Sequence, residues 1–196
     1  MNATRDETDD RLRDLAVSVR PVNLLGVRVA ARALVNSAEH QRRSVLGLGA
    51  VTDPALLGRL LGLPAQCPRQ DVAVWAETSA AATGIMDCGA DGCTVTRLLE
   101  PPLVVDDVMV PASRGRELRA VQDASLFASF TRRWVQTQGP AMPDTAVLEA
   151  KLCGVGLLSS DGRVLLPAEP STSAAADGWT WLLAEKVYRR WLRQVI

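Results

Sequence analysis

Apolar residues recur every three or four positions in several stretches of the chain, which is the spacing of one face of an α-helix. Over 22–46 this pattern predicts a long helix that ends before Gly47. Asp53 followed by Pro54 is a favourable start for a second, shorter helix. The segment 69–83 has the same spacing. The pattern therefore predicts three helices in the N-terminal half.

Short β-branched runs then alternate with turn residues. The segments 85–86 and 94–96 flank the turn-rich tetrapeptide 89–92, which predicts a β-hairpin. One more strand is expected over 103–110, before the linker-like segment 111–115. The N-terminal half thus reads as helices followed by a hairpin.

The second half repeats this order. We expect a helix from Asp123 that carries Phe127, Phe130 and Trp134 and ends at Gly139. A shorter helix over 144–153 follows it, and the segments 155–158 and 163–166 flank an Asp-Gly turn as a second hairpin. The segment 178–196 has Trp181, Tyr188 and Trp191 on one stripe, which predicts an amphipathic helix docked on its own chain.

The order of helix, helix and hairpin in 54–98 resembles the winged-helix class, in which the second helix enters the major groove of DNA. The expected fold is mainly α with short β-hairpins (α+β), as tandem winged-helix-like units plus a C-terminal amphipathic helix. The expected organisation is a flexible segment 1–20, a first unit 21–110, a linker 111–120 and a second unit 121–196 with the terminal helix.

Charge limits what such units can bind. The 22 basic and 22 acidic residues cancel, so any nucleic-acid binding must rest on a local patch. The expected reading helix 69–83 carries a small acidic surplus, which is unfavourable for phosphate contact. Basic residues gather elsewhere, around Arg28, in the linker and in the C-terminal helix, but the sequence does not show whether they converge.

Two partners therefore stay open. The chain is a DNA-binding protein of transcription regulation or DNA maintenance, or a non-catalytic scaffold subunit that holds a protein partner or a second copy of itself. We place binding chiefly on the linker arginines, and Trp179 is the tryptophan most expected to be exposed. The full set of predicted binding residues is Arg69, Gln70, Thr78, Arg97, Arg114, Arg116, Arg119 and Trp179.

Catalysis has little support in the sequence. His40 is the only histidine, no nucleotide-binding loop is complete, and the cysteines lack the spacing of a zinc knuckle, so we expect no catalytic residue, metal or cofactor. Cys88 and Asp91, with the distant Cys153, are similar to the two thiols and aspartate of organomercurial lyases, which implies a thiol-dependent enzyme as a third alternative.

The expected location is the cytoplasm, with no membrane contact. The first ten residues lack the basic and apolar regions of a secretory signal, and no apolar run is long enough to span a bilayer.

Overall fold

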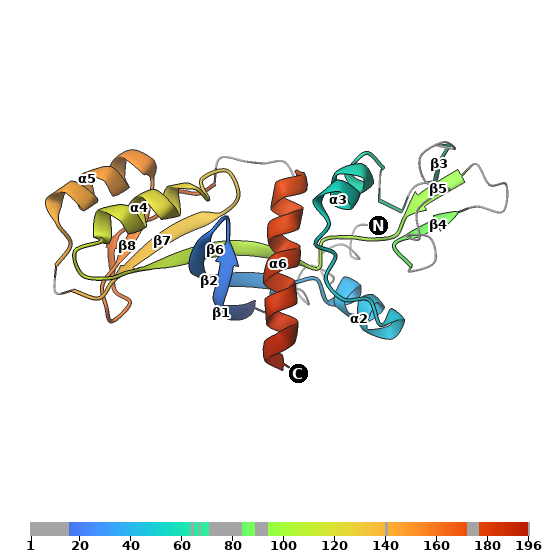
Figure 1. Cartoon of the computed structure of the whole chain (residues 1–196), viewed down its shortest axis with the longest axis horizontal. Helices are drawn as coiled ribbons and strands as arrows, with labels where there is room; N and C mark the ends of the chain where they lie inside the picture. The colour runs from blue at the N-terminus through green and yellow to red at the C-terminus, as the bar shows by residue number, and fades with distance from the viewer. Residues whose placement is uncertain are drawn as a thin grey trace, which may run out of the picture.

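A computed structural model describes residues 16–63, 65–66, 68–70, 84–88, 94–139, 141–171 and 177–195. Its centre is a mixed six-stranded sheet with the order β1-β2-β6-β7-β8-β9 (Figure 1). The strands β1, β2 and β6 are antiparallel, β6, β7 and β8 run parallel, and β9 returns antiparallel at the far edge. The six strands are β1 (Ala16–Leu24), β2 (Val27–Val35), β6 (Leu103–Ala112), β7 (Arg132–Thr137), β8 (Gly156–Leu158) and β9 (Val164–Leu166).

A second, antiparallel sheet of three short strands lies at one end of the molecule, in the order β3-β5-β4 (Figure 1). Two helices lie between it and the large sheet in the chain and in space. These elements are β3 (Pro68–Gln70), β4 (Met86–Cys88), β5 (Thr94–Arg97), α2 (Ser37–Leu46) and α3 (Pro54–Leu61). Their small core includes Leu57, Leu60 and Val95 and reaches Trp181 of the last helix.

Three further helices cover one face of the large sheet. They are α4 (Glu117–Ser125), α5 (Asp144–Cys153) and α6 (Gly178–Val195). Val27, Val29, Ala31 and Ala33 of β2 are buried in one apolar cluster with residues of all three helices. The even-numbered residues, including Arg28 and Arg32, face the other way and are mostly exposed. On the opposite face, β2 therefore carries the two arginines beside Ala30 and Leu34.

The expected fold class is wrong, because the chain is built on a large mixed sheet rather than on helices with hairpins. Strands from both expected winged-helix-like units belong to the same sheet, and the expected wing β4–β5 belongs to a separate sheet with β3. Residues 68–70, where the expected reading helix begins, form β3, and 71–83 lie outside the described residues.

The expected helix over 22–46 is instead a hairpin followed by α2. Buried and more exposed side chains alternate along β2, which is the period of a strand. Its alanines and its leucine also fit the spacing of one face of a helix, so the sequence pattern is compatible with both. Leu25 and Gly26 form the turn with φ values of 51° and 81°. A two-residue turn with positive φ at both positions is of type I′, and leucine rarely adopts positive φ, so the first position of this turn gives no sequence signal.

The helix expected from Asp123 is also wrong. The helix α4 begins at Glu117 and ends at Ser125, and Trp134 lies in the central strand β7. Residues 132–137 alternate between half-buried and buried side chains, with Arg133, Val135 and Thr137 facing the core. This alternation of side chains, with a period of two residues, is that of a β-strand. The segment is too short for its sequence to distinguish this period from the 3.6-residue period of a helix.

Several elements lie where short-range features of the sequence, such as capping residues and turns, predict them. Asp53 caps α3 by accepting hydrogen bonds from the backbone N–H groups of Ala55 and Leu56. The hairpins β4–β5 and β8–β9, the strand β6 and the helices α5 and α6 lie where the sequence predicts them. Within the described part of the chain, every helix is too short or too polar to cross a bilayer.

Gly156 shows how tightly the open face is packed at β8. A Cβ atom there would lie 2.3 Å from Cε3 of Trp134 and 2.7 Å from Cβ of Ala168. We expect Gly156→Ala to lower the free energy of unfolding by about 1–3 kcal/mol, because the indole must move. Gly58→Ala in α3, where a Cβ meets nothing within 4 Å, should raise it by about 0.5–1 kcal/mol. Urea denaturation measures both, and equal effects would contradict this packing.

Candidate anion-binding groove

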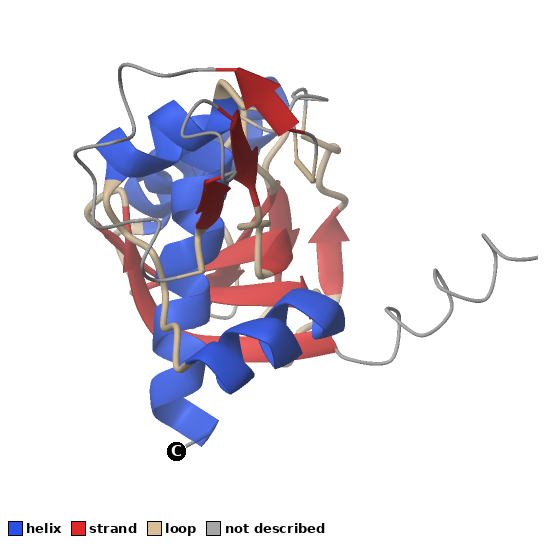
Figure 2. Ribbon diagram, turned by 90° about the vertical axis from the view of Figure 1, so that its right-hand side faces the viewer, coloured by secondary structure: helices blue, strands red, loops and turns tan. Residues whose placement is uncertain are grey.

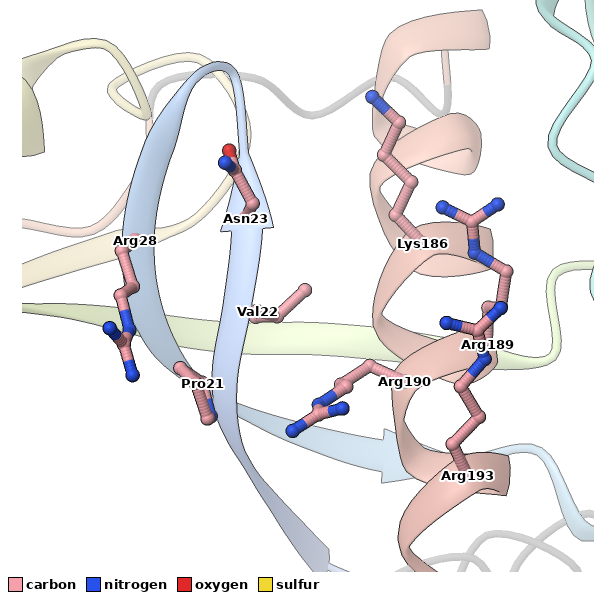
Figure 3. Close-up of a pocket in the computed structure, with 8 residues that line it drawn as sticks. All are labelled: Pro21, Val22, Asn23, Arg28, Lys186, Arg189, Arg190 and Arg193. Carbon is pink, nitrogen blue, oxygen red and sulfur yellow. The ribbon is translucent and has the colours of Figure 1, made fainter.

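A groove lies between the β1–β2 hairpin and the C-terminal half of α6 (Figure 3). Its volume is about 370 Å³. The hairpin and the helix contribute eight lining residues, which are Pro21, Val22, Asn23, Arg28, Lys186, Arg189, Arg190 and Arg193. Five of the eight are cations, and we call this set the basic groove.

The helix α6 presents its four cations because of their spacing. Arg189 and Arg190 follow Lys186 by three and four residues and precede Arg193 by four and three, so the four cations form one stripe along the helix. The opposite stripe, which includes Val187 and Tyr188, is buried against the large sheet. Arg28 reaches the groove from β2, on the face of the sheet that the helices leave open. In Figure 3 the guanidinium of Arg190 lies between the helix and the hairpin.

The charges of the basic groove are uncompensated among the described residues. None of the described residues that line it carries a carboxylate. No ion pair joins any of the five cations to a described acidic residue, whereas Arg32, Arg43 and Arg132 all have carboxylate partners. The Nε atom of Arg190 is buried with no described hydrogen-bond partner. Such a concentration of positive charge attracts anions, although the whole chain is neutral.

A buried ionic network fixes α6 in place. Arg43 of α2 and Glu185 of α6 are both fully buried, and two hydrogen bonds of 2.7 and 2.9 Å join them. Glu185 also accepts from the backbone N–H of Val51 and from Nε1 of Trp181. Arg43 in addition donates to Glu39 at 2.7 Å. Burial lowers the pKa of Arg43, but hydrogen bonds and charge from Glu185 and Glu39 outweigh it and hold the pKa above its usual value.

The far end of α6 is attached to β1. Nε2 of Gln194 donates to the backbone oxygen of Arg20 at 2.6 Å. β1 is an edge strand of the large sheet, and the helix, which ends at the label C in Figure 2, packs along it. His40 and Tyr188 join α2 to α6 by a further hydrogen bond of 2.9 Å, beside the ring of Trp191. The two walls of the basic groove are therefore held together by the fold itself.

The predicted residues whose side chains are described lie elsewhere. Arg114 and Arg116 are exposed in the turn before α4, and Arg119 on α4 pairs with Asp123 at 3.0 Å. This group lies on the part of the molecule that carries α4 and α5, and none of the three lines the basic groove (Figure 1). Trp179 is 61% exposed at the start of α6, as the sequence predicts.

The remaining predicted residues belong to the region of the small sheet. Arg97 is the last residue of β5, and its Nη1 donates to the backbone oxygen of Leu60. Arg69 and Gln70 lie in β3, where only the backbone is described, and Thr78 lies outside the described residues. The five predicted residues whose side chains are described do not come together in one site.

The thiols offer no organised centre in the described part of the chain. Cys153 is free and half-buried, with its Sγ 3.8 Å from a carboxylate oxygen of Glu149. Cys88 lies in β4, and Asp91 lies outside the described residues. Over the residues that are described, no three His, Cys, Asp or Glu side chains gather in a way that could hold a metal ion.

Comparison with protein-family models, with curated proteins and with solved structures finds no match to this chain.

Proposed function

We propose that this chain binds DNA, with the basic groove contacting the phosphate backbone. The observation that supports the proposal is the convergence of five cations from β2 and α6 on one groove with no described carboxylate among its lining residues. Phosphate contacts supply most of the sequence-independent affinity of proteins for DNA. Four of the five cations are arginines, whose planar guanidinium groups bind phosphate through two parallel hydrogen bonds.

The shape of the site suits a backbone contact rather than the reading of bases. The basic groove lies between a helix and a two-stranded ribbon. Four cations lie along the helix, and Arg28 lies on the β2 strand of the ribbon (Figure 3). Phosphate contacts fix the position of a protein on the duplex and carry no sequence information by themselves. We therefore expect binding with little sequence preference. The cytoplasmic location expected from the sequence stays a prediction. It is compatible with DNA binding in a cell without a nucleus.

The salt dependence of binding tests this function. We expect a labelled DNA duplex to bind the full chain at low salt, with the logarithm of affinity falling linearly against the logarithm of salt concentration. Up to five phosphate contacts give a slope of roughly −4 to −5 on that plot. Fluorescence anisotropy over about 50–200 mM salt measures it. Duplexes of unrelated sequence should give similar affinities.

Two results would contradict the proposal. One is the absence of binding at the lowest salt concentration at which the protein remains monodisperse. The other is binding with a slope near zero, which would show that few counterions are released and that phosphates are not the contact. If the chain binds an acidic protein with the same salt dependence and does not bind DNA, the scaffold alternative is favoured instead.

A further inference from the structure

A second cleft, with a different character, lies on the other side of α6. Its volume is about 530 Å³, and it is bounded by α3, the end of β5, the start of β6, the segment before β7 and the first turns of α6. Leu61, Val104, Phe130 and Trp181 contribute apolar walls. Val104 is 64% exposed at the rim, whereas Trp181 is buried at the base. We call it the apolar cleft.

One cation in the apolar cleft, Arg97, forms no ion pair with a described carboxylate. Arg97 lies over the ring of Trp181, 5.3 Å from its centroid, and Nη1 donates to the backbone oxygen of Leu60. Its Nε is buried with no described partner. Burial lowers the pKa of Arg97, and the charge of Glu100 offsets this only in part. A partly buried guanidinium held against an apolar wall is costly unless an anion compensates it.

The other charged residues of the cleft do not supply that anion. Arg132 and Asp106 both line the cleft, and they pair with each other. On the α6 side, Thr180 Oγ1 is buried and has no hydrogen-bond partner among the described residues. Among the described residues, the cleft therefore combines apolar walls, one cation without an ion-pair partner and a buried hydroxyl without a hydrogen-bond partner. This is the usual composition of a site for a small organic ligand.

We propose that the apolar cleft binds a small amphipathic anion, an aromatic or aliphatic body that carries a carboxylate or sulfonate. The body packs between Val104, Phe130 and Leu61, and the anionic group faces Arg97. This ligand site is separate from the basic groove, and the proposal does not depend on DNA binding.

A matched pair of dyes tests the proposal. Anilinonaphthalene sulfonate has an aromatic body and one anionic group, and phenylnaphthylamine has the same body without the charge. The fluorescence of both rises in apolar surroundings. We expect the sulfonate to bind the full chain with one dye per chain, and more tightly than the neutral dye. Arg97→Met should lower the affinity for the sulfonate by about tenfold to a hundredfold and change the affinity for the neutral dye little, because only the charged contact is lost.

Controls separate the cleft from other surfaces. Val104→Glu at the exposed rim should leave the melting temperature close to that of the parent chain and weaken the sulfonate more than the neutral dye. Arg189→Ala with Arg193→Ala in the basic groove should leave both dyes unaffected. The proposal is overturned if neither dye binds, or if Val104→Glu and Arg97→Met weaken the binding of both dyes equally. It is also overturned if the variant of the basic groove is the only one that abolishes sulfonate binding.

Discussion

Replacing Glu185 by leucine is expected to lower the free energy of unfolding by about 3–5 kcal/mol, because it leaves the buried guanidinium of Arg43 without its main partner. Arg43 and Glu185 have no exposed side-chain surface, so water cannot take over the lost contacts. The backbone N–H of Val51 and Nε1 of Trp181 would lose their acceptor as well. The same residues hold α6 against α2, so the effect should reach the whole fold.

Chemical denaturation followed by tryptophan fluorescence measures this effect, and a double-mutant cycle identifies its cause. Combining Glu185→Leu with Arg43→Met removes both charges, so we expect the double variant to be more stable than Glu185→Leu alone. The exposed pair Arg119 and Asp123 provides a surface control, for which Arg119→Ala should change stability by less than about 1 kcal/mol. A Glu185→Leu variant as stable as the parent would show that the buried network does not stabilise the fold.

The sequence predicts those elements whose signals are local. The proline and aspartate that begin α3, and the glycine that ends α5, act within a few residues of the helix they bound. Gly154 has a φ of 66°, a conformation that glycine adopts without strain. The Asp-Gly turn between β8 and β9 is equally local. These positions need no knowledge of the rest of the chain.

The large sheet depends on pairing that the sequence does not display. The segment 27–35 fits both a helical and a strand period, and only its pairing with β1 and with the distant β6 makes it a strand. The segment 132–137 becomes a strand because it lies between β6 and β8. Tertiary context overrides local periodicity in both cases.

The candidate site was missed for a related reason. Arg28 and the cations of the C-terminal helix are visible in the sequence as basic residues, but they belong to opposite ends of the chain. They converge because α6 packs along β1, next to the hairpin that carries Arg28. The linker arginines stand out in the sequence because they are close neighbours, and the structure places them outside the groove.

Reversing three charges of the basic groove is expected to abolish DNA binding. Arg189→Glu, Arg190→Glu and Arg193→Glu together remove three phosphate contacts and place three carboxylates beside the phosphates that remain bound by Arg28 and Lys186. Affinity at low salt should fall by a factor on the order of 100 or more, because both lost contacts and like-charge repulsion oppose binding. Arg189 and Arg193 are exposed and Arg190 is half-buried, so the fold should be retained.

The chain supplies a matched control. Arg114→Glu, Arg116→Glu and Arg119→Glu change the net charge by the same amount on exposed residues outside the basic groove. Both triple variants lose the same overall attraction for a polyanion, so a difference between them reports the location of the contact. Melting temperatures of the two variants should be compared first, to establish that both remain folded.

The most direct test of DNA binding at the basic groove is the affinity of these two triple variants for one DNA duplex, measured by anisotropy in the same low-salt buffer. We expect the groove variant to show no saturable binding, while the linker variant keeps an affinity within about tenfold of the parent chain. The reverse order, with binding lost in the linker variant and kept in the groove variant, would contradict the assignment and place the DNA contact on the turn before α4.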